Sequence, residues 1–313
     1  MEKIVNVYLP TLFEFVYYPF AVVDVFTEHG LSHPIKYCYG TIRCLWSNNY
    51  DSYIKFEDKK YIETILSNHK ERNIIPVINF SKVEIEPDEL NDDFCNYFLD
   101  IAIQNNAEFI VASDLLYDYI KLKYPKAKLI ASVNKTIDKF FRYDDLEEER
   151  AFYDELLIKY DKVVIRPEFI INGGELPNDK DRLIIIPNSA CKMGCLKTRE
   201  CVSMSTLGFE CYRTIQKRKY GVAKSLENLT MLTLEDVQNS GVPNILLKDN
   251  KQPLLFMLPL YSNYLFDYLP ENLNIRIRER VCEYKVREEF NSSQHVMFFG
   301  TMFYCKSNEV GII

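Results

Sequence analysis

Residues 75–112 contain two short aliphatic runs, Ile75-Pro-Val-Ile-Asn-Phe80 and Phe109-Ile-Val-Ala112, on either side of the segment Asp88–Gln104. Aliphatic runs of this length, bounded by polar and turn-forming residues, are typical of buried strands. The apolar residues of the segment between them recur at i, i+3 and i+4, which is the spacing of a helix with one buried face. This part of the chain therefore predicts a strand–helix–strand unit, the building block of a parallel sheet.

The same alternation extends in both directions from this unit. Further helices are expected at Asp58–His69 and Leu146–Lys159, and Thr233 with Asp236 has the spacing of a helix cap. Eight strands separated by helices predict a (β/α)8 TIM-like barrel, complete or incomplete, over residues 1–270. The expected strands are Ile4–Leu9, Ile35–Tyr39, Ile75–Phe80, Phe109–Ala112, Lys128–Ser132, Lys162–Arg166, Leu183–Pro187 and Asn244–Leu247.

An open, doubly wound sheet is the alternative α/β architecture. Such sheets usually carry a glycine-rich turn after the first strand, where phosphate binds. The corresponding turn here is Pro10-Thr11-Leu12-Phe13 and has no glycine, which favours the barrel. The alternation stops after about Pro270, and residues 271–313 are expected to form a C-terminal appendage that packs on the barrel.

Composition sets the broad class of the protein. The chain has 313 residues, of which 47% are hydrophobic, with a net charge of −7, so it can bury a core of its own. No apolar run reaches the roughly 18 residues of a membrane span, and residues 1–4 do not open a secretory signal. We therefore expect a cytoplasmic protein. Nine cysteines, an odd number in such a compartment, argue against a disulfide framework.

Four of the nine cysteines lie within 21 residues, directly after the seventh expected strand. In a barrel this is the C-terminal face, where loops build active sites. Four thiolates at irregular spacing suit an iron–sulfur cluster, whereas structural zinc usually shows two closely spaced pairs. Buried free thiols are the remaining alternative. The predicted metal ligands are Cys191, Cys195, Cys201 and Cys211, in a cysteine-rich loop over residues 188–224.

The motif Asn-x-x-Cys-x-x-x-Cys after an aliphatic strand, here Asn188, Cys191 and Cys195, resembles the collagenase-like peptidase family. This group of TIM-barrel proteins includes those of oxygen-independent ubiquinone hydroxylation and of RNA hydroxylation. The resemblance implies a 4Fe-4S cluster held by four cysteines, two of them from this motif, and Cys38 or Cys44 could replace one of the other two. Relatives commonly carry His-Tyr after the second cysteine and a Lys-Ile-Glu-Gly-Arg-like stretch after the eighth strand. This chain departs from them at both places.

Candidate residues for substrate binding lie on the same predicted face. Arg166 and Arg199 can bind an anion, although Arg166 can equally form a salt bridge at the barrel mouth, and Asn188 opens the cysteine segment. Residues 191–224 contain eight basic and two acidic residues. The net negative charge of the whole chain nevertheless disfavours a long nucleic acid as partner, and a small or nucleotide-like substrate is expected instead.

Two functions follow from these features. The first is oxygen-independent hydroxylation, or a related redox or group-transfer reaction, at an iron–sulfur cluster. The second is a non-catalytic subunit of a heteromeric complex, with zinc or another metal in a structural site. A peptidase, as the family name suggests, is less favoured, because none of the four histidines lies in a His-Glu-x-x-His motif and no Gly-x-Ser-x-Gly turn is present.

Overall fold

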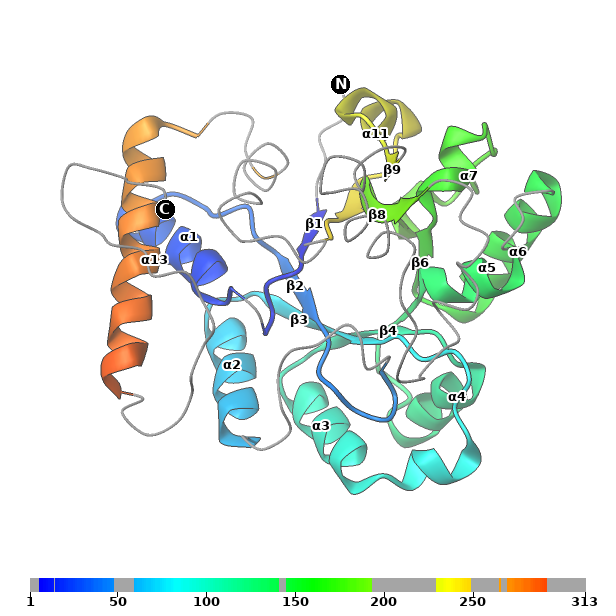
Figure 1. The fold of residues 1–313 in the computed structure, drawn as a ribbon, viewed down its shortest axis with the longest axis horizontal. Coiled ribbons are helices and arrows are strands. Elements are labelled where there is room, and N and C mark those ends of the chain that lie inside the picture. Colours follow the sequence, from blue (N-terminus) through cyan, green and yellow to red (C-terminus); the bar gives the residue numbers. More distant parts are fainter. Residues whose placement is uncertain are drawn as a thin grey trace, which may run out of the picture.

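A computed structural model describes residues 6–13, 15–47, 59–140, 145–192, 229–248, 265 and 269–291. Figure 1 shows these residues as a ring of strands with helices on its outside.

Eight parallel strands close into a barrel in the order β1-β10-β7-β6-β5-β4-β3-β2. The predicted (β/α)8 barrel is thereby confirmed. Each strand falls within one of the eight aliphatic runs or differs from it by one residue at an end. The barrel strands are β1 (Asn6–Leu9), β2 (Tyr37–Gly40), β3 (Ile75–Phe80), β4 (Glu108–Val111), β5 (Leu129–Ala131), β6 (Lys162–Ile165), β7 (Leu183–Ile185) and β10 (Asn244–Leu246).

Helices follow most of the strands, as the sequence predicts. The expected helix over residues 146–159 is found unchanged, whereas the one expected over 58–69 begins at Lys59 among the described residues and continues to Glu71. The helices are α1 (Tyr17–Glu28), α2 (Lys59–Glu71), α3 (Asp93–Gln104), α4 (Asp114–Lys123), α5 (Val133–Lys139), α6 (Leu146–Lys159), α7 (Pro167–Ile171), α11 (Leu234–Ser240) and α13 (Glu271–Asn291), with 3-10 turns η1 (Pro87–Asn91) and η2 (Lys180–Arg182).

Helix ends are set by local capping. The segment expected as one helix over residues 88–104 divides into η1 and α3, because Asp92 has an extended backbone and its side chain accepts a hydrogen bond from the amide of Cys95 at 2.7 Å. The cap predicted before α11 is confirmed. There, the amide of Asp236 donates to the Thr233 hydroxyl at 3.1 Å, and the Thr233 amide donates to the Asp236 carboxylate at 2.8 Å.

The apolar side chains form two clusters because successive residues of a strand point to opposite faces. In β3, Val77 belongs to the cluster that fills the barrel, whereas Ile78 and Phe80 belong to the larger cluster between strands and helices. The filling of the barrel is a packed core and not a channel. It comprises Tyr8, Tyr37, Val77, Ile110, Ile130, Val133, Val164, Ile184, Ile186 and Leu246.

A two-stranded antiparallel sheet stands outside the barrel, where β7 ends. It pairs β8 (Asn188–Lys192) with β9 (Leu229–Met231), and the amide of Leu232 donates to the carbonyl of Pro187 at 2.8 Å. The sequence predicts the cysteine segment here but not this hairpin. Its strands are short, and residues 193–228 separate them.

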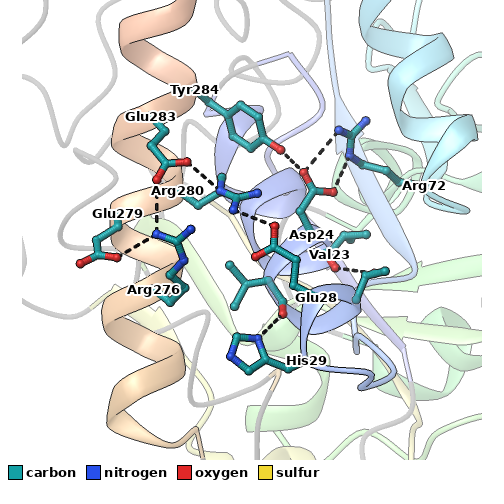
Figure 2. Close-up of polar contacts among 12 residues, drawn as sticks. Val23, Asp24, Glu28, His29, Arg72, Arg276, Glu279, Arg280, Glu283 and Tyr284 are labelled. Carbon is teal, nitrogen blue, oxygen red and sulfur yellow. Dashed lines mark hydrogen bonds and ion pairs between the residues drawn. The ribbon is translucent and has the colours of Figure 1, made fainter.

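The segment after residue 270, for which the sequence predicts only an appendage, begins with the long helix α13. Figure 2 shows how α13 packs against α1 through charged side chains. Arg280 pairs with Glu28 of α1 at 2.7 Å, and the Tyr284 hydroxyl donates to Asp24, which also pairs with Arg72 of α2 at 3.2 Å. Neither α13 nor any other described helix is long and apolar enough to cross a membrane.

Candidate functional site

Polar side chains gather at the C-terminal ends of neighbouring barrel strands. In β3, for example, the barrel-filling Val77 is followed two residues later by Asn79, which the alternation of the strand places on the same inward side. The same spacing applies to three further strand ends, and β7, β10, β1, β2 and β3 are consecutive around the barrel. We call this set the mouth layer. Its members are Tyr39, Asn79, Asn188 and Lys248.

Asn188 fastens the end of β7 to the end of β10. Its side-chain Nδ2 donates to the carbonyl of Lys248 at 2.6 Å, and its Oδ1 accepts from the Lys248 amide at 2.8 Å. The hydroxyl of Tyr39 donates to the neighbouring carbonyl of Leu247 at 2.8 Å. The side chain of Asn188, which the sequence predicts to bind substrate, is 3% exposed. Its two hydrogen bonds hold two strand ends together at the mouth.

Asn79 offers a hydrogen-bond acceptor at the mouth. Its Oδ1 is buried and has no hydrogen-bond partner among the described residues, although buried polar atoms are usually satisfied. Its main-chain carbonyl is occupied, since it accepts from the Thr41 hydroxyl at 2.9 Å and from Ser47 at 3.3 Å. A hydrogen-bond donor on a bound molecule would satisfy this side-chain oxygen.

Of the four predicted metal ligands only Cys191 lies among the described residues, and the ligand role of all four stays a prediction. Cys191 lies in β8, three residues after Asn188, so its backbone leaves the barrel at the mouth. Cys195, Cys201 and Cys211, and with them the anion-binding candidate Arg199, lie outside the described residues. Within the described residues no group of three or more histidines, cysteines or acidic residues can hold a metal ion.

The two cysteines considered as substitute ligands lie in the outer core. Cys38 is fully enclosed, its sulfur accepts from the Thr11 hydroxyl at 3.4 Å, and burial raises its thiol pKa to about 12. Cys44 is a buried thiol, outside any disulfide, that shares a hydrogen bond of 3.3 Å with the Ser47 hydroxyl and another with Cys95. Both belong to the cluster between strands and helices.

Arg166 forms the salt bridge that the sequence allows as one of its two roles. Its side chain at the end of β6 is 1% exposed and pairs with the equally enclosed Glu149 of α6, with Nε at 2.6 Å from the carboxylate. Nη1 donates to the carbonyl of Phe140 at 2.6 Å, and the Tyr153 hydroxyl donates to Glu149 at 2.8 Å. The anion that Arg166 binds in this structure is Glu149.

A pocket of about 520 Å³ lies on the β4 and β5 side of the same barrel end. It contains Lys135 of α5, whose side chain is 7% exposed and pairs with Asp114 at 2.9 Å. Burial lowers the pKa of Lys135, and its bonds to Asp114 oppose this only in part. The sequence does not single out this lysine. The pocket is lined by Val83, Ala112, Asp114, Lys135, Asp138, Lys139 and Phe152.

The opposite end of the barrel holds a second polar network. The ammonium of Lys162, at the start of β6, donates to the hydroxyl of Tyr8 at 2.7 Å and that of Tyr37 at 3.3 Å, and lies 3.6 Å from Glu108. The two tyrosine rings stack with centroids 4.2 Å apart. Because barrel enzymes act at the other end, we assign this network to stability.

Comparison with known proteins finds a likeness at the level of structure and none at the level of sequence. No protein-family model matches the chain, and no curated protein matches it. A solved structure of the U32 peptidase Mk0906 superposes on 69% of this chain and 85% of its own, with 11% sequence identity and a TM-score of 0.41. The chain is therefore similar in part to this peptidase structure, and its architecture as a closed (β/α)8 barrel rests on its own strands.

Proposed function

We propose that this barrel carries a cysteine-ligated iron–sulfur cluster above its mouth and uses it in a redox or group-transfer reaction, such as oxygen-independent hydroxylation, on a small or nucleotide-like molecule. The observation that carries the proposal is the position of β8. The strand bearing Cys191 leaves the barrel at the mouth layer, where Asn188 fixes it to the end of β10 through two hydrogen bonds.

The donor set fits such a group. Cys191, Cys195, Cys201 and Cys211 offer four thiols within one segment of the chain, and thiolates are the usual ligands of iron–sulfur clusters. A bound cluster would supply one-electron chemistry. The chain's own residues would bind the substrate, and Asn79 is the first candidate, because its buried side-chain oxygen has no donor among the described residues and a hydroxyl or amine of a ligand can donate to it.

Anaerobic purification tests the proposal. The purified full chain should be brown and should show visible absorption bands from charge transfer between thiolate and iron. It should also contain iron and acid-labile sulfide. Cys195→Ser should lose most of the iron, whereas Cys282→Ser should keep it, since Cys282 lies in α13, outside the cysteine segment. A colourless protein without iron and sulfide under these conditions would contradict the cluster.

A structural metal in a non-catalytic subunit gives a different set of results. In that case zinc would co-purify in place of iron, and Cys195→Ser would lower the thermal midpoint of unfolding along with the metal content. A native partner would then be recovered with the wild-type chain and lost with the variant. Iron, sulfide and a reversible redox transition together would instead support the catalytic reading.

A further inference from the structure

The pocket beside the mouth is lined by a lysine that is almost completely enclosed. Lys135 is 8% exposed, and the pocket volume of about 520 Å³ lies within the usual range for small-molecule sites. Apolar walls come from Val83, Ala112 and Phe152. A primary amine therefore lines a partly apolar pocket of a size that suits a small molecule.

The fold explains why this lysine points inward. The Ser132 hydroxyl caps α5 by accepting from the amide of Asn134 at 3.2 Å, and Val133 packs into the filling of the barrel. Lys135 then reaches toward the end of β4. Its ammonium lies 3.1 Å from the carbonyl of Ala112 and 2.9 Å from Asp114. Two of its three donors are thus accounted for, and one is left for the pocket.

The ammonium group of Lys135 is only partly balanced by negative charge. Asp114 pairs with Lys135 and also with Lys159 at 2.9 Å, so that one carboxylate serves two ammonium groups. Burial lowers the pKa of Lys135 because the low-dielectric surroundings disfavour its charged form. A larger share of this amine is therefore neutral near pH 7 than of an exposed lysine, whose pKa is about 10.4.

We propose that Lys135 is the amine nucleophile of a site that takes a small aldehyde or ketone and binds it covalently as a protonated imine. Its ammonium gives a proton to Asp114, and the free amine forms a C–N bond with the carbonyl carbon. The carbonyl oxygen takes up that proton and a second one from the nitrogen, and leaves as water. The products are the protonated imine and one water molecule, so the step needs no oxidant, reductant or further reactant.

Asp114 is placed to carry the proton. Its carboxylate is within hydrogen-bond distance of the attacking nitrogen, and hydrogen bonds from Lys135 and Lys159 hold its pKa below the ordinary value, although burial opposes them. The pocket lies at β4 and β5, whereas the cysteine hairpin begins at β7. The proposed imine step uses none of the cysteines, so it can be tested separately from the proposed cluster.

Reductive trapping measures the reactivity directly. The full wild-type chain is treated at pH 7 with a low excess of propionaldehyde and sodium cyanoborohydride, and peptide mass spectrometry follows propylation at every lysine. Lys139 is the matched internal control, since it lines the same pocket and is exposed. We expect Lys135 to react several-fold faster than Lys139, because burial lowers the pKa of Lys135 and Asp114 lies within hydrogen-bond distance to accept its proton. Its rate should also level off at a lower pH.

Variants separate an imine site from a structural ion pair. Lys135→Met should abolish the fast-reacting site, while Lys126→Gln, at an exposed lysine outside the pocket lining, should leave it unchanged. Asp114→Asn should slow trapping at Lys135 several-fold, even though loss of the carboxylate raises the share of neutral amine. In urea the preference for Lys135 should vanish. Trapping of the folded wild-type chain at Lys135 no faster than at Lys139 across pH 6–9 would overturn the proposal, as would faster trapping in Asp114→Asn.

Discussion

Glu149 and Arg166 form an ion pair in which each side chain is only 1% exposed. Removing one partner of such a pair leaves a charge in the core, which costs about 3–5 kcal/mol, whereas replacing both by apolar residues can be nearly neutral. We expect Glu149→Leu to lower the free energy of unfolding by about 4 kcal/mol and the double variant Glu149→Leu/Arg166→Met to recover much of the loss. Urea unfolding of the two variants measures the difference. Equal losses of unfolding free energy in the single and the double variant would contradict a buried ion pair between these two residues.

The stability of the protein should fall as the pH drops below 6.5, because His69 is buried and His33 is half-buried. Burial lowers the pKa of His69 from 6.5 to about 4, and it also lowers the pKa of His33. The unfolded chain binds a proton at about pH 6.5, while folded His69 stays neutral down to about pH 4. Its contribution is therefore complete above pH 6.5 and lost as the pH falls toward 4.

The loss from His69 amounts to about 3 kcal/mol between these two pH values. Folded His69 donates from Nδ1 to the carbonyl of Ile65 at 2.8 Å and packs on the ring of Phe20. His69→Asn can keep that donor without a titrating ring, so the variant should show a shallower decline. Thermal unfolding at a series of pH values from 7.5 to 4 compares the two slopes, and parallel slopes would count against a neutral buried ring.

Lys162 should be the most sensitive residue at the N-terminal end of the barrel. Lys162→Met leaves the enclosed carboxylate of Glu108 with Lys128 alone, which is 66% exposed and 3.6 Å away, and we expect a loss of about 3 kcal/mol. Tyr8→Phe removes one hydrogen bond and should cost about 1 kcal/mol. As a control, Lys128→Met should cost less than about 1 kcal/mol. Denaturant unfolding of the three variants tests this order.

Asn188 should contribute to stability through both of its hydrogen bonds to Lys248. Asn188→Ala removes the pair and should lower the free energy of unfolding by about 2 kcal/mol. Asn134→Ala, which removes a single bond of 2.8 Å to the carbonyl of Ser81, should cost about half as much. If the cluster is present, Asn188→Ala should also reduce the iron content, because β8 would no longer be fixed at the mouth. Unchanged unfolding would contradict the role given to Asn188.

The sequence predicts the barrel because each strand is buried on both faces and so appears as a short aliphatic run, as in Ile75–Phe80. The sequence predicts only part of the mouth layer. Because side chains alternate along β3, the sequence alone shows that the polar Asn79 falls on the otherwise apolar inward face of the strand. Whether it meets Asn188 or another residue depends on the order of strands around the barrel, which no single run contains.

Other features depend wholly on tertiary contacts. Lys135 lies in a short helix with other charged residues, and its sequence resembles that of any solvated helix. Only the positions of Asp114 and Ala112 show that its amine is enclosed. The helix α13 has many charged residues and only a narrow apolar stripe, of which Leu273 and Ile277 are buried in the outer core. Its ion pairs with α1 depend on the tertiary arrangement, which the sequence pattern does not contain.

The pairing of β1 with β10 has a consequence for biosynthesis. Asn6 lies opposite Asn244, and their side chains form a hydrogen bond of 2.8 Å, so the ring closes between segments that leave the ribosome far apart in time. Until then β1 has an open edge, and such edges invite pairing with other chains. Nascent chains that end before residue 244 should therefore depend on chaperones, and release from them should coincide with emergence of β10 from the exit tunnel.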